Sequence, residues 1–493
     1  MKAFLIIPMG GKGKRFVNAG FKTYKSFLKA EGGNSIFENI ISNFKGFNLE
    51  IIILANSKKL KKYNKFVKKK NIHIVNIEDH NKGPLFSIFQ GLEKIKKIVK
   101  NNENIFFSYT DINWKWNINK IKKIIKTKKI IVFTHTGFHP HLETNPKSDF
   151  CLIKNNQVKY IKQKKTFTNN YKKEFLASGC YYLKNVNLLE NFFLNFKKNF
   201  FNKKEYYFVS LINYFIDKNI IVNNFQINKF VHLGTPTQYL DFLKWKDTIN
   251  SNRKINLNKN LTIMLAGGKG KRVGSLNKEK PFLNFLNKPI YKYIFDKYSS
   301  KKKIIITNKK FNKYFKVRKY KIHLIPKTNS MFDSILFSEK LLKYNDNYIL
   351  TSCDCFGDFN LRLMQMKKNK YDMIFFAFKF SEIQKKLYNA HTQLITTSKN
   401  ITNIRVKKPF KSNYLGHAGF FWINSGKVFN FLKEYKNSQN YKKLEREILI
   451  DDYFSYLVKY KKVNASYIVL DNYVHLGSTI EYLEYNYWKD YFN

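Results

Sequence analysis

Cysteine is scarce in this sequence, and long apolar runs are absent. The 493 residues contain four cysteines, Cys151, Cys180, Cys353 and Cys355, whose spacing matches no metal-ligand pattern. Cys353 and Cys355 are also too close in sequence for an easy disulfide, so we expect a protein of the reducing cytoplasm. No run of about 18 uncharged apolar residues occurs, which argues against membrane insertion through a transmembrane helix.

Arginine is equally scarce, although the chain is very basic. Only seven of the 91 basic residues are arginine, and the formal net charge is +57. Lysine is in excess together with Asn, Ile, Phe and Tyr, which share A/T-rich codons, and the lysines are spread along the chain. Codon bias therefore explains the charge better than a nucleic-acid interface does. We expect general attraction of anions but no specific nucleic-acid partner.

One glycine-rich loop stands out because it occurs twice. Residues 4–16 read FLIIPMGGKGKRF, and residues 261–273 read LTIMLAGGKGKRV. In both, an apolar run predicted to be a buried strand breaks into the same six residues, GGKGKR. The glycines allow a tight turn and a close approach to a ligand, and the amides and cations suit a polyphosphate. The loop is neither a Walker loop, which closes with Gly-Lys-Ser/Thr, nor a dinucleotide fingerprint, because Val273 replaces the third glycine.

Further landmarks repeat at a constant offset of 243 residues. The pairs are Asp111 and Asp354, each after an apolar run; residues 161–167 (IKQKKTF) and 404–410 (IRVKKPF); and His232 and His475, each just before a helix with a predicted capping box. A duplicated domain accounts for all of these pairs. The expected organisation is a first domain over residues 1–246, a polar linker over 247–260 and a second domain over 261–493.

Short apolar runs alternate with lysine-rich amphipathic stretches in both halves. Residues 51–54 and 105–109 illustrate the apolar runs, and residues 92–99 illustrate the amphipathic stretches. This alternation predicts an α/β fold in which helices cover both faces of a mainly parallel sheet.

Taken in order, these landmarks resemble the sugar-nucleotide pyrophosphorylase (nucleotidyltransferase) family, in two tandem copies. That family opens with a strand and a Leu-Ala-Gly-Gly-x-Gly-x-Arg loop, continues to Lys-Pro, and places an Asp at a strand end. It closes with Glu-Lys-Pro, a glycine-aromatic strand and Trp-x-Asp-x-Gly-Thr-Pro. The second half has the fuller loop (residues 265–272, then Lys280-Pro281), and the first has the fuller end (residues 234–236). The resemblance implies two doubly wound, mainly parallel-sheet domains of the nucleotidyltransferase, GT-A-like type.

By position, the resemblance assigns roles to residues in both halves. It implies that the nucleotide is bound by Gly10, Gly11, Lys12, Gly13, Gly83, Gly267, Gly268, Lys269 and Gly270. The residues implied to act on the reacting phosphates are Arg15, Lys25, Lys164, Arg272, Lys280 and Lys407. Among these, Lys164 and Lys407 would reach the acceptor phosphate, and Gly83 would contact the base. Asp111 and Asp354 would hold Mg²⁺, because a hard cation prefers carboxylate and phosphate oxygens.

The implied reaction joins an NTP to a sugar 1-phosphate, or to a related phosphorylated acceptor, and releases pyrophosphate. The resemblance links such a reaction to surface-polysaccharide precursors. Two alternatives stay open at this level. Either one half is a nucleotide-binding regulatory copy, or the chain is a glycosyltransferase of related fold that uses a nucleotide sugar.

Several residues depart from the family pattern. Gln163 and Val406 stand where the family has Glu before its conserved Lys, and Tyr24 stands where it has proline. His232 and His475 replace the second metal-binding Asp. Each histidine is therefore expected either to bond the backbone at the start of a helix or to lie near the phosphates. There a neutral imidazole could bind a metal ion, whereas a protonated one would contact phosphate directly.

Overall fold

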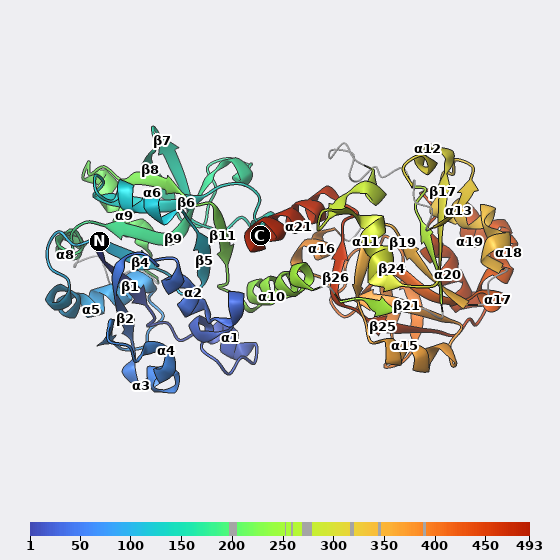
Figure 1. Ribbon diagram of the computed structural model, residues 1–493, viewed down its shortest axis with the longest axis horizontal. Helices are drawn as coiled ribbons and strands as arrows, with labels where there is room; N and C mark the ends of the chain where they lie inside the picture. Colours follow the sequence, from blue (N-terminus) through green and yellow to red (C-terminus); the bar gives the residue numbers. More distant parts are fainter. Residues whose placement is uncertain are drawn as a thin grey trace. The chain divides into compact units, whose positions relative to one another are not determined.

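The computed structural model describes residues 1–196, 205–251, 253–257, 260–268, 279–315, 320–343, 347–387 and 391–493. The chain forms two compact units, one made of Met1–Lys246 with Asp490–Asn493 and the other of Asp247–Lys489 (Figure 1). Each unit combines helices with a sheet that contains parallel strands. Within the described ranges, no helix is both long and apolar enough to cross a membrane.

The first unit is built on a nine-stranded mixed sheet. In spatial order the strands are β3 (Ile72–Asn76), β2 (Asn48–Ala55), β1 (Lys2–Pro8), β4 (Ile105–Ser108), β9 (Phe175–Leu183), β6 (Ile130–His135), β10 (Asn223–Gln226), β8 (Gln157–Lys162) and β7 (Phe150–Lys154). The strands β3, β2, β1 and β4 are parallel, whereas β9 is antiparallel to both β4 and β6. Because β1 and β4 are parallel neighbours, their carboxyl ends meet at one sheet edge, where ligands bind in such folds.

The large sheet of the second unit has the same order of corresponding strands. It runs β18 (Lys321–Ile325), β17 (Lys302–Asn308), β13 (Leu261–Leu265), β19 (Asn347–Ser352), β24 (Leu415–Asn424), β21 (Met373–Phe378) and β25 (Ala465–Val469), with β22 (Gln393–Thr396) on β24 and β23 (Ile401–Arg405) on β22. Again β13 and β19 are parallel neighbours, and β24 is antiparallel to β19 and β21. Four neighbouring strands of each sheet are parallel, as predicted, but the sheets are mixed rather than mainly parallel. β9 and β24 run antiparallel to both of their neighbours in the strand order, and the β7–β8 and β22–β23 pairs are antiparallel as well.

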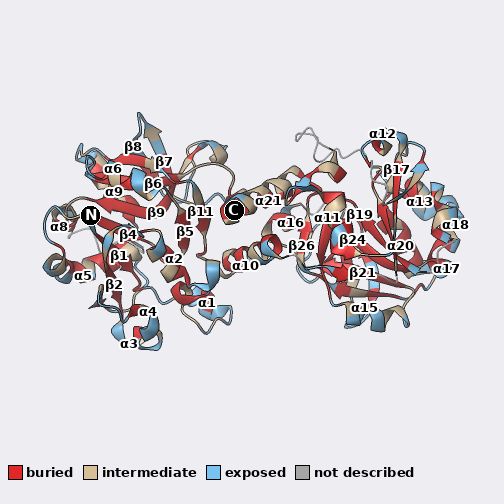
Figure 2. Ribbon diagram, viewed as in Figure 1, coloured by how far each residue is buried: buried red, intermediate tan, exposed pale blue. Residues whose placement is uncertain are grey.

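Both sheets are buried at their centres. Every residue of β1 after Lys2 is buried, and so is the whole of β21. A strand covered on both faces carries a continuous apolar run, which is the pattern of both segments. Helices α5 (Pro84–Ile98) and α9 (Phe208–Asp217) join the core of the first unit, and α20 (Ile450–Tyr460) joins that of the second. Figure 2 shows these buried strands in red.

A two-stranded ribbon lies beside the edge of each large sheet. The ribbons pair β5 (Ile112–Lys115) with β11 (Lys229–His232) and β20 (Cys355–Asp358) with β26 (Asp471–His475), both antiparallel. β5 and β20 directly follow Asp111 and Asp354. The Leu233 amide donates to the Asp111 carbonyl at 2.6 Å, and the Leu476 amide donates to the Asp354 carbonyl at 2.8 Å. The ribbons therefore fix the ends of β11 and β26 beside the two strand-end aspartates.

The segment expected to be a polar linker, residues 247–260, contains regular structure. The helix α10 (Pro236–Asn250) extends into it, and β12 (Ile255–Asn256) pairs in parallel with β16 (Tyr298–Ser299). Ile255 and Leu257 are both buried. Two apolar residues at this spacing share one face of a strand. An alternation of only two apolar residues within a polar segment is too short to predict a strand from the sequence.

Candidate active sites

The first glycine-rich loop joins β1 to the short helix α1 (Lys14–Asn18). A Cβ added to Gly10 would lie 2.6 Å from His80 Nε2 and 2.8 Å from Ser87 Oγ, so a side chain does not fit there. Gly13 has φ +64°, a left-handed conformation that favours glycine. Gly11, Lys12 and Arg15 are exposed, as expected for a loop that meets a ligand from solvent.

Tyr24, one of the departures from the family pattern, anchors this loop through hydrogen bonds. Its hydroxyl donates to the Met9 carbonyl at 3.2 Å and to the Gly11 carbonyl at 3.1 Å. Lys59 Nζ also donates to the Gly11 carbonyl, at 2.8 Å, and lies 4.3 Å above the Tyr24 ring. The loop carbonyls are thus occupied by donors from within the unit. Such anchoring holds the loop in one conformation, which is a requirement for positioning phosphates.

Lys25 and Asp111 form the polar centre of the first site. Lys25 Nζ lies 2.8 Å from Asp111 Oδ2, and the aspartate side chain is 28% exposed. Burial would raise the pKa of Asp111, but the charge and hydrogen bond of Lys25, together with His232, lower it overall. A carboxylate and a fixed cation therefore stand at the sheet edge that the glycine-rich loop also occupies.

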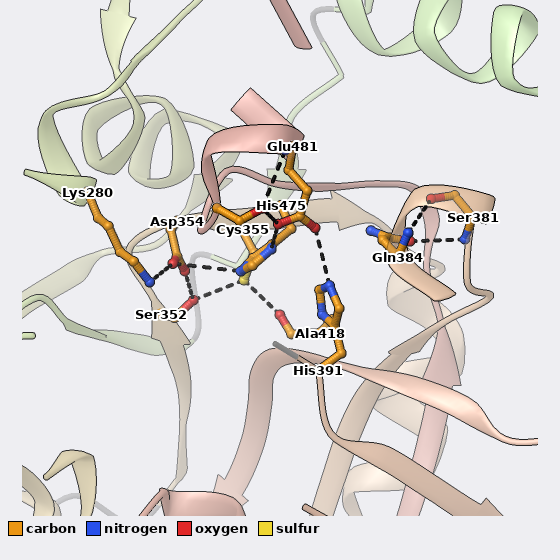
Figure 3. A network of polar contacts seen from close by, with 11 residues as sticks. Lys280, Ser352, Asp354, Cys355, Ser381, Gln384, His391, Ala418, His475 and Glu481 are labelled. Atoms are coloured by element: carbon orange, nitrogen blue, oxygen red, sulfur yellow. Dashed lines mark hydrogen bonds and ion pairs between the residues drawn. The ribbon is translucent and has the colours of Figure 1, made fainter. Parts of the chain in front are cut away.

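Lys280 and Asp354 repeat this arrangement in the second unit. Lys280 Nζ lies 2.9 Å from Asp354 Oδ2, and the Ser352 hydroxyl donates to Oδ1 at 2.7 Å (Figure 3). The side chain of Asp354 is only 8% exposed. Burial would raise its pKa, but Lys280, His475 and Ser352 lower it. The second carboxylate is therefore more enclosed than the first, and both of its oxygens have partners.

Part of the second glycine-rich loop lies outside the described residues. Gly267 and Gly268 follow β13 after Ala266, and the Gly267 carbonyl accepts a hydrogen bond from Asn308 Nδ2 at 3.1 Å. Lys269, Gly270 and Arg272 belong to residues 269–278, which the description does not cover. Their predicted contacts with phosphate stay predictions.

The two histidines at the ribbon ends lie beside the aspartates. His475 Nε2 is 3.7 Å from Asp354 Oδ2, and its Nδ1 is 2.6 Å from Glu481 Oε2 (Figure 3). Its partners are thus side chains, not the backbone groups that one of the two expectations named. Burial lowers the pKa of His232 to about 4, against the opposing effect of Asp111, so this imidazole is neutral near pH 7.

The helix that follows His232 begins with the complete predicted capping box, and the helix that follows His475 shows one of its two bonds, from the Glu481 amide to Ser478 Oγ at 3.4 Å. In α10 the Gln238 amide donates to Thr235 Oγ1 at 3.2 Å, and Gln238 Oε1 accepts from the Thr235 amide at 3.1 Å. In α21 (Thr479–Phe492) the Ser478 hydroxyl donates to Glu481 Oε2 at 2.7 Å. Burial would raise the pKa of Glu481, but His475 and His391 hold it well below its usual range. Glu481 is therefore an ionised carboxylate where the first unit has a neutral amide.

Lys164 and Lys407 share an unusual backbone conformation. Their φ angles are +55° and +49°, in the left-handed region that non-glycine residues rarely adopt. The recurrence follows from the duplicated fold, because Asn219 and Lys462 also share positive φ at corresponding positions. The Lys164 ammonium lies 3.6 Å from a Glu205 carboxylate oxygen and 5.3 Å above the Tyr207 ring. Its side chain is 57% exposed, so it remains accessible to an anionic ligand.

Asp149 is a candidate site residue that the sequence did not reveal. Burial raises its pKa to about 6, although its carboxylate accepts a hydrogen bond from the Lys164 amide and feels the Lys164 charge. A carboxyl group with a raised pKa beside a strained lysine is typical of a functional site. Thr392 stands at the corresponding position of the second unit. No repeated motif therefore marks Asp149 in the sequence.

Gly83 has a packing role that is separate from any contact with a nucleotide base. It precedes α5 with φ +83°, and an added Cβ would lie 2.5 Å from the Tyr206 carbonyl oxygen and 2.8 Å from the Tyr206 nitrogen. Two backbone hydrogen bonds hold Tyr206 there, from its amide to the Lys82 carbonyl and from the Leu85 amide to its own carbonyl.

Gly83→Ala is therefore expected to destabilise the first unit by more than backbone strain alone, which costs about 1–3 kcal/mol. Gly137→Ala is the matched control, because Gly137 also has positive φ (+97°) but no described atom lies within 4 Å of its added Cβ. Chemical denaturation of the two full-length variants gives the comparison. Equal losses of stability in the two variants would show that the contact with Tyr206 adds nothing to the cost of backbone strain.

The donor atoms at the two aspartates suit a magnesium ion. Asp111 offers a carboxylate that is 28% exposed, so water and phosphate oxygens could complete an octahedral shell. Asp354 offers the same chemistry, but its oxygens are already bonded to Lys280 and Ser352. A cation there would share the carboxylate with Lys280. The first unit therefore fits Mg²⁺ more readily than the second.

No family model matches this sequence, and no curated protein matches it. Among solved structures, the chain is similar to the nucleoside-diphosphate-sugar pyrophosphorylase from Vibrio cholerae RC9, with 17% identity and a TM-score of 0.40 over 49% of this chain and 99% of the other. It is similar to the inositol-1-phosphate CTP transferase from T. maritima, with 16% identity and a TM-score of 0.37 over 47% and 96%. It is also similar to a UDP-glucose pyrophosphorylase complexed with UDP-glucose, with 15% identity and a TM-score of 0.37 over 46% and 96%. Each likeness covers about half of this chain.

Proposed function

We propose that the chain is a magnesium-dependent nucleotidyltransferase with two tandem sites. It would join an NTP to a sugar 1-phosphate, or to a related phosphorylated acceptor, in the cytoplasm and release pyrophosphate. The observation that carries this proposal is the repeated lysine–aspartate pair, Lys25–Asp111 and Lys280–Asp354, at 2.8 and 2.9 Å. Each pair lies where a glycine-rich loop and an aspartate follow two parallel neighbouring strands.

The position of the pair suits phosphoryl-group chemistry. The loop after β1 and Asp111 after β4 lie at one sheet edge because the two strands are parallel neighbours. Amide groups and the exposed Lys12 and Arg15 would bind the triphosphate, and Lys25 would balance charge at the reacting phosphate. Such transfer needs positioning and charge neutralisation rather than a covalent catalyst.

In the proposed reaction an acceptor phosphate oxygen attacks the α-phosphorus in line. The new oxygen–phosphorus bond forms as the bond to the bridging oxygen breaks, and pyrophosphate leaves with that electron pair. Asp111 and Asp354 would hold Mg²⁺, which neutralises charge on the phosphates. Lys164, with Asp149 bonded to its backbone, would bind the acceptor phosphate in the first unit; Lys407 would do so in the second. The production of surface-polysaccharide precursors would be one use of the nucleotide sugar.

A second candidate gives the two units different tasks. Asp354 is 8% exposed with both oxygens bonded, whereas Asp111 is 28% exposed. A carboxylate so enclosed suits a unit that binds nucleotide without turning it over. In this version the first unit is catalytic and the second is a regulatory copy. A glycosyltransferase of related fold is less favoured, because the cation-rich loop suits a triphosphate better than a nucleotide sugar.

Incubation of the full-length protein with each of the four NTPs and a panel of sugar phosphates tests this function. We expect pyrophosphate release that requires Mg²⁺, with a product mass equal to an NMP joined to the acceptor. Omission of the acceptor is the control for simple hydrolysis of the NTP. Absence of pyrophosphate release from the folded protein with every NTP and acceptor would contradict the proposal.

A further inference from the structure

A cluster of two histidines and a glutamate lies behind Asp354 in the second unit. His475 ends β26, Glu481 lies in the first turn of α21, and His391 precedes β22. Glu481 Oε2 is 2.6 Å from His475 Nδ1, and Glu481 Oε1 is 3.2 Å from His391 Nε2. Figure 3 shows the Glu481 carboxylate between the two imidazole rings. One ligand atom from each of the three residues lies within 4.8 Å of the other two.

This cluster is almost closed to water. The side chains of His391 and Glu481 are each 2% exposed, and that of His475 is 8% exposed. A buried carboxylate needs a compensating positive charge as well as hydrogen bonds, because removing an ion from water is costly. Among the described residues, the ion pairs found for Glu481 are those with His391 and His475, whereas Lys280 is paired with Asp354. Glu481 therefore requires either a proton shared with the imidazoles or a cation.

We propose that His391, His475 and Glu481 bind a divalent transition-metal ion of the zinc type. Two imidazoles and one carboxylate form a donor set that zinc accepts, with water in the fourth position. Magnesium prefers an all-oxygen shell, so nitrogen donors separate this ion from the Mg²⁺ expected at Asp354. The site is independent of the proposed nucleotidyl transfer, since neither His391 nor Glu481 is assigned a part in that reaction.

The three ligand atoms are close to the spacing that a bound ion requires. Ligand atoms on a tetrahedral ion with bonds of about 2.0–2.1 Å lie roughly 3.3 Å apart. Glu481 Oε1 is 3.2 Å from His391 Nε2 and Oε2 is 2.6 Å from His475 Nδ1, so binding through one oxygen requires the carboxylate to rotate between the two rings. His475 would bind through Nδ1 while Nε2 faces Asp354 at 3.7 Å. A carboxylate on the far nitrogen of a metal-bound histidine orients the ring.

The first unit lacks two of the three ligands. At the corresponding positions it has His232, but Gln238 replaces Glu481 and Ser148 replaces His391. The Gln238 side chain accepts hydrogen bonds from the Gly234 and Thr235 amides at the start of its own helix. The metal site would therefore belong to the second unit alone. Bound there, the ion would fix the position of His475 beside Asp354.

The test uses the full-length protein without a histidine tag, freed of metal by a chelator and titrated with Co²⁺. We expect the visible absorption of a cobalt ion with low coordination number, and this signal should saturate at one equivalent of Co²⁺. Addition of Zn²⁺ should displace the Co²⁺ and abolish the absorption, whereas excess Mg²⁺ should leave it unchanged. His391→Gln and Glu481→Gln should each weaken Co²⁺ binding by at least about tenfold, because even outer partners of a ligand cost 10–100-fold. Neither readout depends on NTP or acceptor, so failure here is distinct from failure of the transferase reaction.

His417→Gln is the matched control. His417 is also a buried histidine of the second unit, and its Nδ1 lies 2.8 Å from Asp451 Oδ1, outside the cluster. This variant should bind Co²⁺ like the parent protein. If His391→Gln fails to fold, Glu481→Gln decides alone, because the first unit already has a glutamine, Gln238, at the corresponding helix position. Absence of bound Co²⁺, or unchanged affinity in Glu481→Gln, would overturn the metal site and favour the shared proton.

Discussion

Asp354→Asn is expected to lower pyrophosphate release by the second unit about a hundredfold or more, and Asp111→Asn to do the same in the first unit. The substitution keeps the size of the side chain but removes the charge that would hold Mg²⁺ and balance the lysine. Lys25 and Lys280 would each lose a carboxylate partner at 2.8 and 2.9 Å. Loss of charge at the phosphates acts on the transition state, so kcat should fall more than KM rises.

The two activities can be separated without cutting the chain. Full-length Asp111→Asn reports the second unit, Asp354→Asn reports the first, and the double variant gives the background. Asp296→Asn is the control, because Asp296 is 46% exposed in a surface pair with Lys288. Unchanged turnover by the double variant would rule out both metal assignments. Full loss in Asp111→Asn alone would favour the version in which only the first unit is catalytic.

The sequence predicted the features that recur, because a local pattern that is weak by itself becomes convincing when it occurs in both halves of the chain. Asp111 and Asp354 form such a pair, the family resemblance assigns Lys25 and Lys280, and the structure brings each lysine within 3 Å of its aspartate. The parallel centre of each sheet likewise followed from alternating apolar and amphipathic segments. Whether these residues have the chemical roles that the resemblance implies stays a prediction.

The sequence did not predict the residues that surround these pairs. His391 and Glu481 are 90 positions apart, and Asp149 meets Lys164 only because β7 and β8 pair. Contacts of this kind depend on the tertiary fold and leave no periodic signal. The sequence shows Tyr24 only as a residue in place of the family's proline, yet its hydroxyl donates to two loop carbonyls. Residues that do not recur in both halves therefore carry no sequence pattern that identifies them as part of a site.

Lys280→Met is expected to destabilise the second unit by about 3–5 kcal/mol, because it leaves a buried carboxylate without its cation. The Asp354 side chain is 8% exposed, whereas Asp111, the partner of Lys25, is 28% exposed and can regain water. Lys25→Met should therefore cost the first unit less than half as much. Both changes should raise the pKa of the remaining aspartate, since each lysine lowers it.

Hydrogen exchange of the full-length variants distinguishes the two units. Peptides from β19 and β24 report the second unit, and peptides from β4 and β9 report the first. Lys288→Met is the control, because that lysine is 57% exposed in its pair with Asp296 and surface pairs contribute at most about 1 kcal/mol. Equal losses of protection in Lys25→Met and Lys280→Met would contradict the difference in burial. If the difference holds, Lys25→Met is the cleaner probe of catalysis, since a fall in its turnover would report lost charge at the phosphates rather than a loosened unit.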